Sequence, residues 1–190
     1  ALLLSLVYPV TAVKAPAIPA LTRQPKLVWV DSGIMNFSVD IQTEYLQNSS
    51  LLDVWKGHAA KQIVAQELRV VLDRNYRNEQ YFWVRDKKGS NAEVDFVWQY
   101  QSAIIPIEVK SGTNAHLRSL HSFMSQPDAP DVAIRIWTGE FGIDEVVSPT
   151  DHPFRLINIP FYYVGVLDKV LESVVHCNHL PINKHKNIRL

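Results

Sequence analysis

The sequence has only one cysteine, Cys177, in 190 residues, so a single chain cannot form an internal disulfide. Such sparse use of cysteine is typical of proteins in a reducing compartment, and we expect a cytoplasmic protein. An excess of charge is also missing, because 19 basic and 19 acidic residues give a formal net charge of +0. Proteins that bind nucleic acid non-specifically are usually basic, so any such contact here requires a local basic patch.

Several enzyme motifs are absent as well. No G-x-x-x-x-G-K-[ST] P-loop occurs, so the sequence predicts no ATPase site in this chain, and the seven scattered glycines form no dinucleotide-binding fingerprint. No G-x-S-x-G elbow is present, and Cys177 in a polar tail is a poor candidate nucleophile. The apolar run ALLLSLVYPV is about half the length needed to cross a bilayer and follows no basic segment. We therefore predict no membrane association.

The length indicates one medium-sized domain with short appendages. Four of the 11 prolines fall within residues 1–25, which favours an extended segment. We interpret residues 1–25 as a linker or as the end of a missing upstream module, whose last helix would include the first residues. Residues 26–175 are the predicted domain, and residues 176–190 are a polar, flexible tail.

Hydrophobic periodicity predicts an α/β fold with a mixed central sheet flanked by helices. A helix spans residues 56–74, three strands span 80–85, 92–99 and 103–110, a helix follows Asn114, and strands span 132–138 and 155–159. A short strand at 26–30, a helix from Ile34 capped by Ser32, and a closing helix at 161–175 complete the set. The order helix, three-strand meander, helix, strand implies antiparallel pairing within the meander and a parallel crossover after it.

Acidic residues and a lysine meet on two strands of the meander. Residues two apart in a strand point the same way, so Glu93 shares a face with Asp95, and Glu108 shares a face with Lys110. The apolar residues between and beside them are expected on the other face: Val94, Phe96, Trp98, Ile105, Ile107 and Val109.

The register can be predicted one step further. If Gln101 and Ser102 form a two-residue loop, Tyr100 pairs with Ala103, Asp95 lies opposite Glu108, and Glu93 lies opposite Lys110. Paired residues have Cβ atoms about 4.5–5.5 Å apart, which suits two carboxylates sharing a cation such as Mg²⁺. A slip of one residue would move the second set to the other face.

The helix at 56–74 adds a further acid. Ala60, Val64, Leu68 and Val71 form its apolar stripe, and Glu67 lies on or beside that stripe, where a buried carboxylate would need a partner or a cation. Lys61, Arg69 and Arg74 are expected to face solvent. The alternative to a metal site is a polar sheet face with solvated acids, in which Lys110 pairs with Glu93 across the hairpin and Glu67 is a rim residue.

Together, a helix Glu67, a strand Asp95 and a strand-closing Glu108-Val109-Lys110 resemble the active-site pattern of the PD-(D/E)XK nuclease superfamily, with Val94 where its name has proline. The segments YFWVRDKKGSNAEVDFV and IIPIEVKSG resemble more closely an uncharacterised, nuclease-like domain C-terminal to bacterial and archaeal AAA+-type ATPase modules. KLVWVDSGIMN and WKGHAAKQIVAQEL resemble its upstream segments, so the similarity covers about residues 20–165.

This resemblance implies a restriction-endonuclease-like core and a catalytic set of Asp95, Glu108 and Lys110. It implies Mg²⁺ or Mn²⁺ held by Glu67, Asp95 and Glu108, with nucleic acid, chiefly DNA, as substrate. An AAA+-type ATPase module in the same full-length chain would be the partner. Two alternatives stay open: a non-cutting module of this fold that binds DNA or protein and regulates the ATPase, and a homo-oligomerisation domain that uses apolar surface at 1–10 or 161–175.

Weaker candidates lie elsewhere in the chain. Four basic residues could contact phosphate, although a solvated turn is the preferred interpretation: Arg85, Lys87, Lys88 and Arg118. The tail residues His176, Cys177, His179 and His185 have no standard zinc-finger spacing. Trp83 and Trp98 are predicted to be core residues rather than base-stacking platforms.

Overall fold

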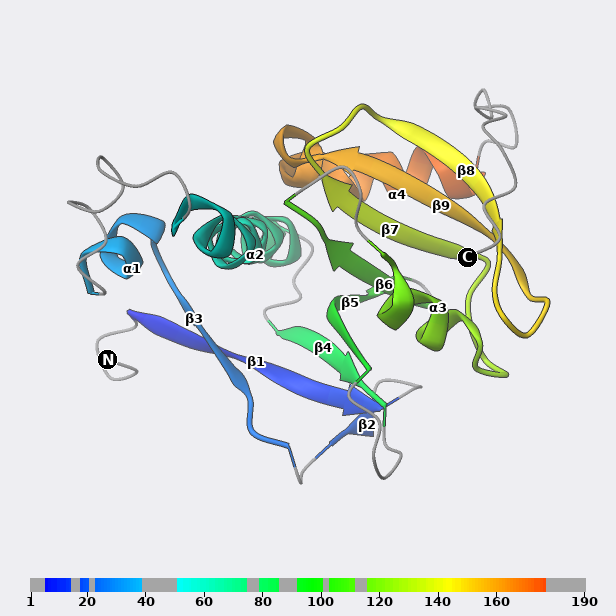
Figure 1. Ribbon diagram of the computed structural model, residues 1–190, viewed down its shortest axis with the longest axis horizontal. Coiled ribbons are helices and arrows are strands. Elements are labelled where there is room, and N and C mark those ends of the chain that lie inside the picture. The colour runs from blue at the N-terminus through cyan, green and yellow to red at the C-terminus, as the bar shows by residue number, and fades with distance from the viewer. Residues whose placement is uncertain are drawn as a thin grey trace.

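The computed structural model describes residues 6–14, 18–20, 23–38, 51–74, 79–85, 92–100, 103–111 and 116–176, and in this part of the chain nine strands form one mixed sheet (Figure 1). The strands are β1 (Val7–Lys14), β2 (Ile18–Pro19), β3 (Lys26–Trp29), β4 (Gln80–Val84), β5 (Glu93–Tyr100), β6 (Ala103–Val109), β7 (Val132–Trp137), β8 (Gly142–Val147) and β9 (Pro153–Pro160). The helices are α1 (Ser32–Ser38), α2 (Leu51–Arg74), α3 (Arg118–Met124), the 3₁₀ helix η3 (Phe161–Val166) and α4 (Leu167–His176).

The sheet has the order β2-β1-β4-β5-β6-β7-β9-β8, and β3 pairs with β1. Pairing is antiparallel within β4, β5 and β6 and parallel from β6 to β7 and from β7 to β9. This confirms the predicted α/β class, the antiparallel meander and the parallel crossover through α3. The predicted helix at 56–74 and the six predicted strands are also present, with ends shifted by a few residues.

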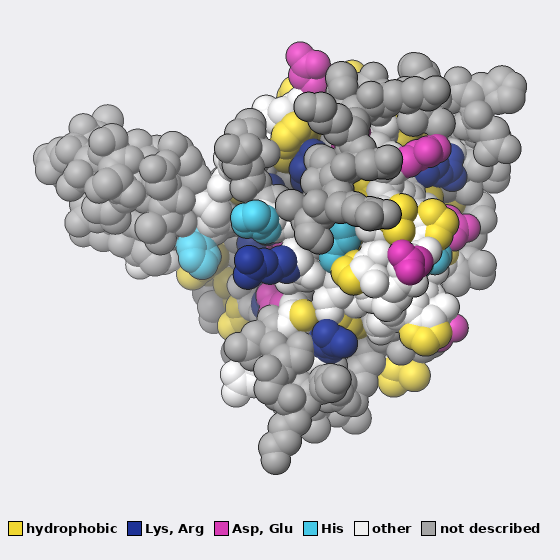
Figure 2. Space-filling view, turned by 45° about the vertical axis from the view of Figure 1, so that its right-hand side comes forward, with side chains coloured by type: hydrophobic (Ala, Val, Ile, Leu, Met, Phe, Trp, Pro, Cys, Tyr) yellow, Lys and Arg dark blue, Asp and Glu magenta, His cyan; other side chains and the backbone are white. Residues whose placement is uncertain are grey.

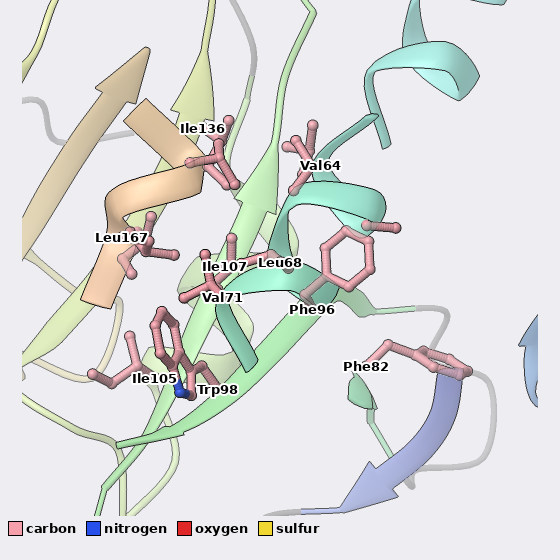
Figure 3. Packing of buried hydrophobic residues seen from close by; sticks show 14 of the residues in the cluster. Val64, Leu68, Val71, Phe82, Phe96, Trp98, Ile105, Ile107, Ile136 and Leu167 are labelled. Atoms are coloured by element: carbon pink, nitrogen blue, oxygen red, sulfur yellow. The ribbon is translucent and has the colours of Figure 1, made fainter. Parts of the chain in front are cut away.

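One face of the sheet is covered by α2, η3 and α4. Val64, Leu68 and Val71 of α2 are almost fully buried, as the predicted stripe requires. Figure 3 shows these side chains pointing toward the sheet and toward Leu167 of α4. Burying each such aliphatic side chain contributes about 1.5–3 kcal/mol, so this layer is the main source of stability.

The other face carries a smaller apolar cluster beneath α3. Leu120, Phe123 and Met124 of α3 are buried there, and Phe123 packs edge-on against Trp83 with ring centroids 5.2 Å apart. Trp83 is 2% exposed and Trp98 is 5% exposed, which confirms that both are core residues. The strands between α2 and α3 are therefore buried on both faces, with β5 and β6 at the centre.

The N-terminal segment differs from the sequence prediction. Residues 7–14 are not a linker or a helix end but strand β1, which pairs with β3 and, in parallel, with β4. Val10 and Ala12 are 0% and 1% exposed, so this strand belongs to the core. The proline spacing was misleading, because proline is tolerated in a strand where its missing N–H is not needed for pairing. Pro9 is such a residue, since pairing of β1 with β4 begins only at Val10.

Three smaller features also differ from the sequence prediction. Helix α1 is capped by Asp31 rather than Ser32, because Oδ1 of Asp31 accepts the N–H of Ile34 at 2.9 Å. Strand β8 was not predicted, since Asp144 and Glu145 interrupt its apolar residues; it is an edge strand with one solvated face. The predicted closing helix begins as the 3₁₀ helix η3 and becomes α-helical only at Leu167.

Candidate functional site

The predicted register of the β5–β6 hairpin is confirmed. Tyr100 pairs with Ala103, and the pairing continues regularly to Phe96 and Ile107. The next positions along this register are Asp95 and Glu108, at the point where the two strands separate. The two carboxylates therefore come from adjacent strands at one place in the sheet.

A β-bulge in β5 changes the faces near Asp95. On the β4 side, Tyr81 pairs with Val97 but Trp83 pairs with Val94, so Asp95 and Phe96 together oppose one residue of β4. Val94 consequently packs in the cluster beneath α3, whereas Phe96 belongs to the cluster beneath α2. The strict alternation expected for Val94, Phe96 and Trp98 is therefore wrong at Val94.

Asp95 is held by contacts to both of its oxygens. The residue is 4% exposed, and its Oδ2 accepts the backbone N–H of Val109 at 3.0 Å. The backbone N–H of Lys110, one residue later, donates to Ile136 of β7 at 2.8 Å. The carboxylate thus replaces a ladder hydrogen bond where β6 leaves β5, which fixes its position in the plane of the sheet.

The second oxygen of Asp95 contacts a lysine from the helix layer. Nζ of Lys61 on α2 lies 2.5 Å from Oδ1 of Asp95, and the Lys61 side chain is 47% exposed. Burial by itself lowers the pKa of Lys61, but Asp95, with smaller contributions from Glu108 and Glu93, raises it above 10.5. Lys61 is exposed, as predicted, but its ammonium also contacts the Asp95 carboxylate, which the sequence did not predict.

Glu108 is the least satisfied member of the cluster. It is 5% exposed, its Oε1 lies 2.8 Å from Nζ of Lys110, and its buried Oε2 has no hydrogen-bond partner in the structure. Burial, and then the negative charge of Asp95, raise the pKa of Glu108 to about 7, against the opposing effect of Lys110 and Lys61. The contact between Glu108 and Lys110 agrees with their predicted shared face.

The other predicted partners are placed differently. Glu93 forms an ion pair of 2.5 Å with Lys26 of β3, rather than with Lys110. Glu67 is an exposed residue of α2, and its carboxylate lies beside Gly165 of η3. A side chain at position 165 would place its Cβ 3.1 Å from Oε2 of Glu67. It lies six positions beyond Lys61, which is about 9 Å along a helix axis.

Within the described part of the chain, no group of three or more His, Cys, Asp or Glu side chains is arranged to hold a metal ion. The structure thus brings Asp95, Glu108 and Lys110 together, adds Lys61, and does not gather Glu67 with them. A signal for Lys61 was available in the sequence, since it lies three residues from Val64 and so borders the apolar stripe of α2.

The donor set suits one divalent cation bound by two carboxylates. Oxygen ligands are what Mg²⁺ and Mn²⁺ prefer, and Mg²⁺ commonly uses one or two carboxylates together with waters. The unpartnered Oε2 of Glu108 supplies a free ligand atom. Lys61 occupies Oδ1 of Asp95, but its half-exposed side chain has room to move into solvent.

Several candidates from the sequence fall outside the described residues: Lys87, Lys88, Cys177, His179, His185 and the side chain of His176. No helix in the described residues is both long and apolar enough to cross a membrane.

The protein is thus an α/β domain with a mixed sheet. Two buried carboxylates, Asp95 and Glu108, and two lysines, Lys61 and Lys110, form an acid–lysine cluster on this sheet. Residues 56–161, more than half of the chain, match the family described as "Domain of unknown function (DUF4143)". The chain belongs to this family, which is uncharacterised and usually found with AAA ATPases. The matched region contains residues 56–74 of α2, the meander of β4, β5 and β6, and all four residues of the acid–lysine cluster: Lys61, Asp95, Glu108 and Lys110. Searches of curated proteins and of solved structures each found no significant match.

Proposed function

We propose that the domain is a divalent-metal-dependent phosphodiesterase acting on nucleic acid, with DNA as the favoured substrate, and that Asp95 and Glu108 are its metal ligands. One observation carries the proposal: two buried carboxylates from adjacent strands converge beside two lysines, and Oε2 of Glu108 has no partner. An unpartnered buried carboxylate oxygen is costly, so its retention at this place needs an explanation. A bound cation provides one.

Each residue has a role that follows from its contacts. Asp95 is held in position by the N–H of Val109 and by its ion pair with Lys61 before a cation binds. Lys110 holds Glu108 and presents a positive charge that can stabilise charge developing on a phosphate. A Mg²⁺ or Mn²⁺ ion bound here would polarise the phosphate and lower the pKa of a bound water. Glu67 could join only through water or after rearrangement, so we give it a subordinate place.

The partner in this proposal is an AAA+-type ATPase module of the full-length protein. The family is usually found with AAA ATPases, and this sequence itself contains no P-loop. A nuclease-like module attached to a motor would act on nucleic acid that the motor moves or remodels.

Cleavage assays test the proposal directly. Purified protein is incubated with Mg²⁺ or Mn²⁺ and with single-stranded and double-stranded DNA and RNA. Wild type should cut at least one substrate, and Asp95→Asn and Glu108→Gln should each lose about 100-fold or more. Glu145→Gln is the matched control, because Glu145 is an exposed acid on edge strand β8. Activity equal in wild type and Asp95→Asn would reject the assignment.

A second candidate is a non-cutting module that binds nucleic acid or protein for the ATPase. The Lys61–Asp95 ion pair favours it, since one carboxylate is already neutralised without a metal. Calorimetric titration with Mn²⁺ separates the two. Binding that disappears in Glu108→Gln supports the nuclease, whereas no binding by wild type, with DNA affinity intact, supports the non-cutting module.

A further inference from the structure

A cavity of about 580 Å³ lies beside α3, and four cationic or ionisable side chains are among the residues that line it: Arg85, His116, Arg118 and His121. None of the described residues that line the cavity is Asp or Glu. Figure 2 shows a face of the molecule on which His side chains and Lys or Arg side chains lie close together. For a chain with no net charge, such a local excess of positive charge is the kind of patch that attracts an anion.

Two arginines reach the cavity from different elements. Arg85 follows β4, its backbone N–H donates to Ala92 at 3.0 Å, and its Nη1 donates to Oγ of Ser122 on α3 at 3.3 Å. Arg118 is the first residue of α3 and is exposed. Guanidinium groups suit phosphate because they offer several donors in a planar fork. The structure therefore brings together two of the basic residues that the sequence separates by about 30 positions.

The loop between β8 and β9 also lines the cavity, through Pro149 and Thr150. Its shape is fixed by Ser148, a buried residue whose Oγ accepts the N–H groups of Thr150 at 3.3 Å and His152 at 3.2 Å. Asp151 has a φ of 58°, an uncommon conformation for a residue other than glycine. The conformation of this loop is therefore fixed by the hydrogen bonds of Ser148 and by the left-handed backbone of Asp151.

The cavity also has an apolar part. Leu117 is 7% exposed, and the ring of His121 packs edge-on against Phe154 with centroids 6.0 Å apart. Burial lowers the pKa of His121 below 6.5, so at neutral pH its ring is an uncharged, flat surface. A cavity lined by two arginines and by an apolar, aromatic surface matches a ligand with an anionic group and a planar ring.

We infer that this cavity is a nucleotide-binding site that takes a nucleoside monophosphate, either free or as the terminal nucleotide of a strand. Arg85 and Arg118 would bind the phosphate, and the surface formed by Leu117 and His121 would contact the base. The volume is within the range of small-ligand pockets and exceeds what phosphate alone would fill. This inference goes beyond the proposed phosphodiesterase and does not depend on it, because neither Asp95 nor Glu108 lines the cavity.

Calorimetry with five probes tests the inference: adenosine monophosphate, adenosine, inorganic phosphate, and a short single-stranded DNA both with and without a 5′ phosphate. Adenosine monophosphate should bind at least tenfold more tightly than adenosine or phosphate. Arg85→Ala and Arg118→Ala should each weaken its binding about tenfold or more, since each removes a charged hydrogen-bonding group. Thermal unfolding of both variants checks that they remain folded.

Two controls make the result specific. Arg23→Ala and Lys169→Ala each remove an exposed cation that does not line the cavity, so both should leave nucleotide affinity unchanged. A strand that binds more tightly with its 5′ phosphate than free nucleotide does would identify a strand end as the ligand, and the reverse would identify free nucleotide. No binding of either at millimolar concentration, or equal binding by the two arginine variants and wild type, would overturn the inference.

Discussion

Nζ of Lys61 lies 2.5 Å from Oδ1 of Asp95, so the helix layer and the sheet are joined by an ion pair at the candidate site. Asp95 is almost completely buried, whereas Lys61 remains half exposed. An ion pair of this kind adds little net stability by itself. It does neutralise the Asp95 carboxylate, which would otherwise be an uncompensated charge inside the domain. A divalent cation bound at the proposed site would therefore compete with Lys61 for this oxygen.

Lys61→Met should therefore have two opposite effects. Without the ammonium, the buried Asp95 carboxylate is left with one hydrogen bond, and we expect a loss of about 1–3 kcal/mol in the free energy of unfolding. Affinity for Mn²⁺ should rise, because its competitor is gone. Urea denaturation and calorimetry measure the two quantities. Lys169→Met, at an exposed position of α4, is the matched control; equal Mn²⁺ affinity in Lys61→Met and wild type would show that the two cations do not compete.

The raised pKa of Glu108 predicts how the free energy of unfolding depends on pH. Its pKa is raised from 4.5 to about 7 on folding, so between these values the folded state binds more protons than the unfolded state. The stabilisation is complete below about pH 4.5, falls as the pH rises toward 7, and is absent above it. Relative to wild type, Glu108→Gln should lose less stability from about pH 5 to pH 8, by up to about 3 kcal/mol.

The comparison is made on differences between variants, because histidines also titrate in this range. Denaturation curves at several pH values for wild type, Glu108→Gln and the control Glu145→Gln give the required free energies. If the wild-type and Glu108→Gln profiles run parallel, Glu108 does not ionise with a raised pKa in the folded protein.

The hairpin and its register were predictable because they depend on local pattern. Period-two alternation in β6 and the connection through residues 101–102 were enough to place Tyr100 opposite Ala103. The bulge at Asp95 was not predictable, because it depends on pairing with β4 and on the hydrogen bond from the N–H of Val109. Both partners are brought to Asp95 only in the folded sheet. Lys61 was missed for a related reason: a helical pattern shows which residues border the buried face, but not which charge lies beneath them.

Gln62 illustrates another contact hidden from sequence patterns. This buried glutamine of α2 accepts the N–H of Trp29 at 3.2 Å and donates to its C=O at 2.6 Å, so it binds both backbone groups of that residue. Gln62→Leu should cost about 1–3 kcal/mol by leaving both groups unpaired. Hydrogen exchange should accelerate most at the amide of Trp29. Gln66→Leu, which removes one bond to Val30, should have the smaller effect on stability.

Asp151 provides a test of the β8–β9 loop that is independent of any ligand. Its φ of 58° is costly for most residues with a Cβ, and aspartate tolerates it better than alanine does. Glycine removes the steric cost but adds entropy to the unfolded chain, so Asp151→Gly should be neutral or stabilising by about 0.5 kcal/mol. Asp151→Ala should instead destabilise by about 1 kcal/mol. Thermal unfolding of the two variants measures this order, and alanine at least as stable as glycine would mean that residue 151 does not adopt a left-handed conformation.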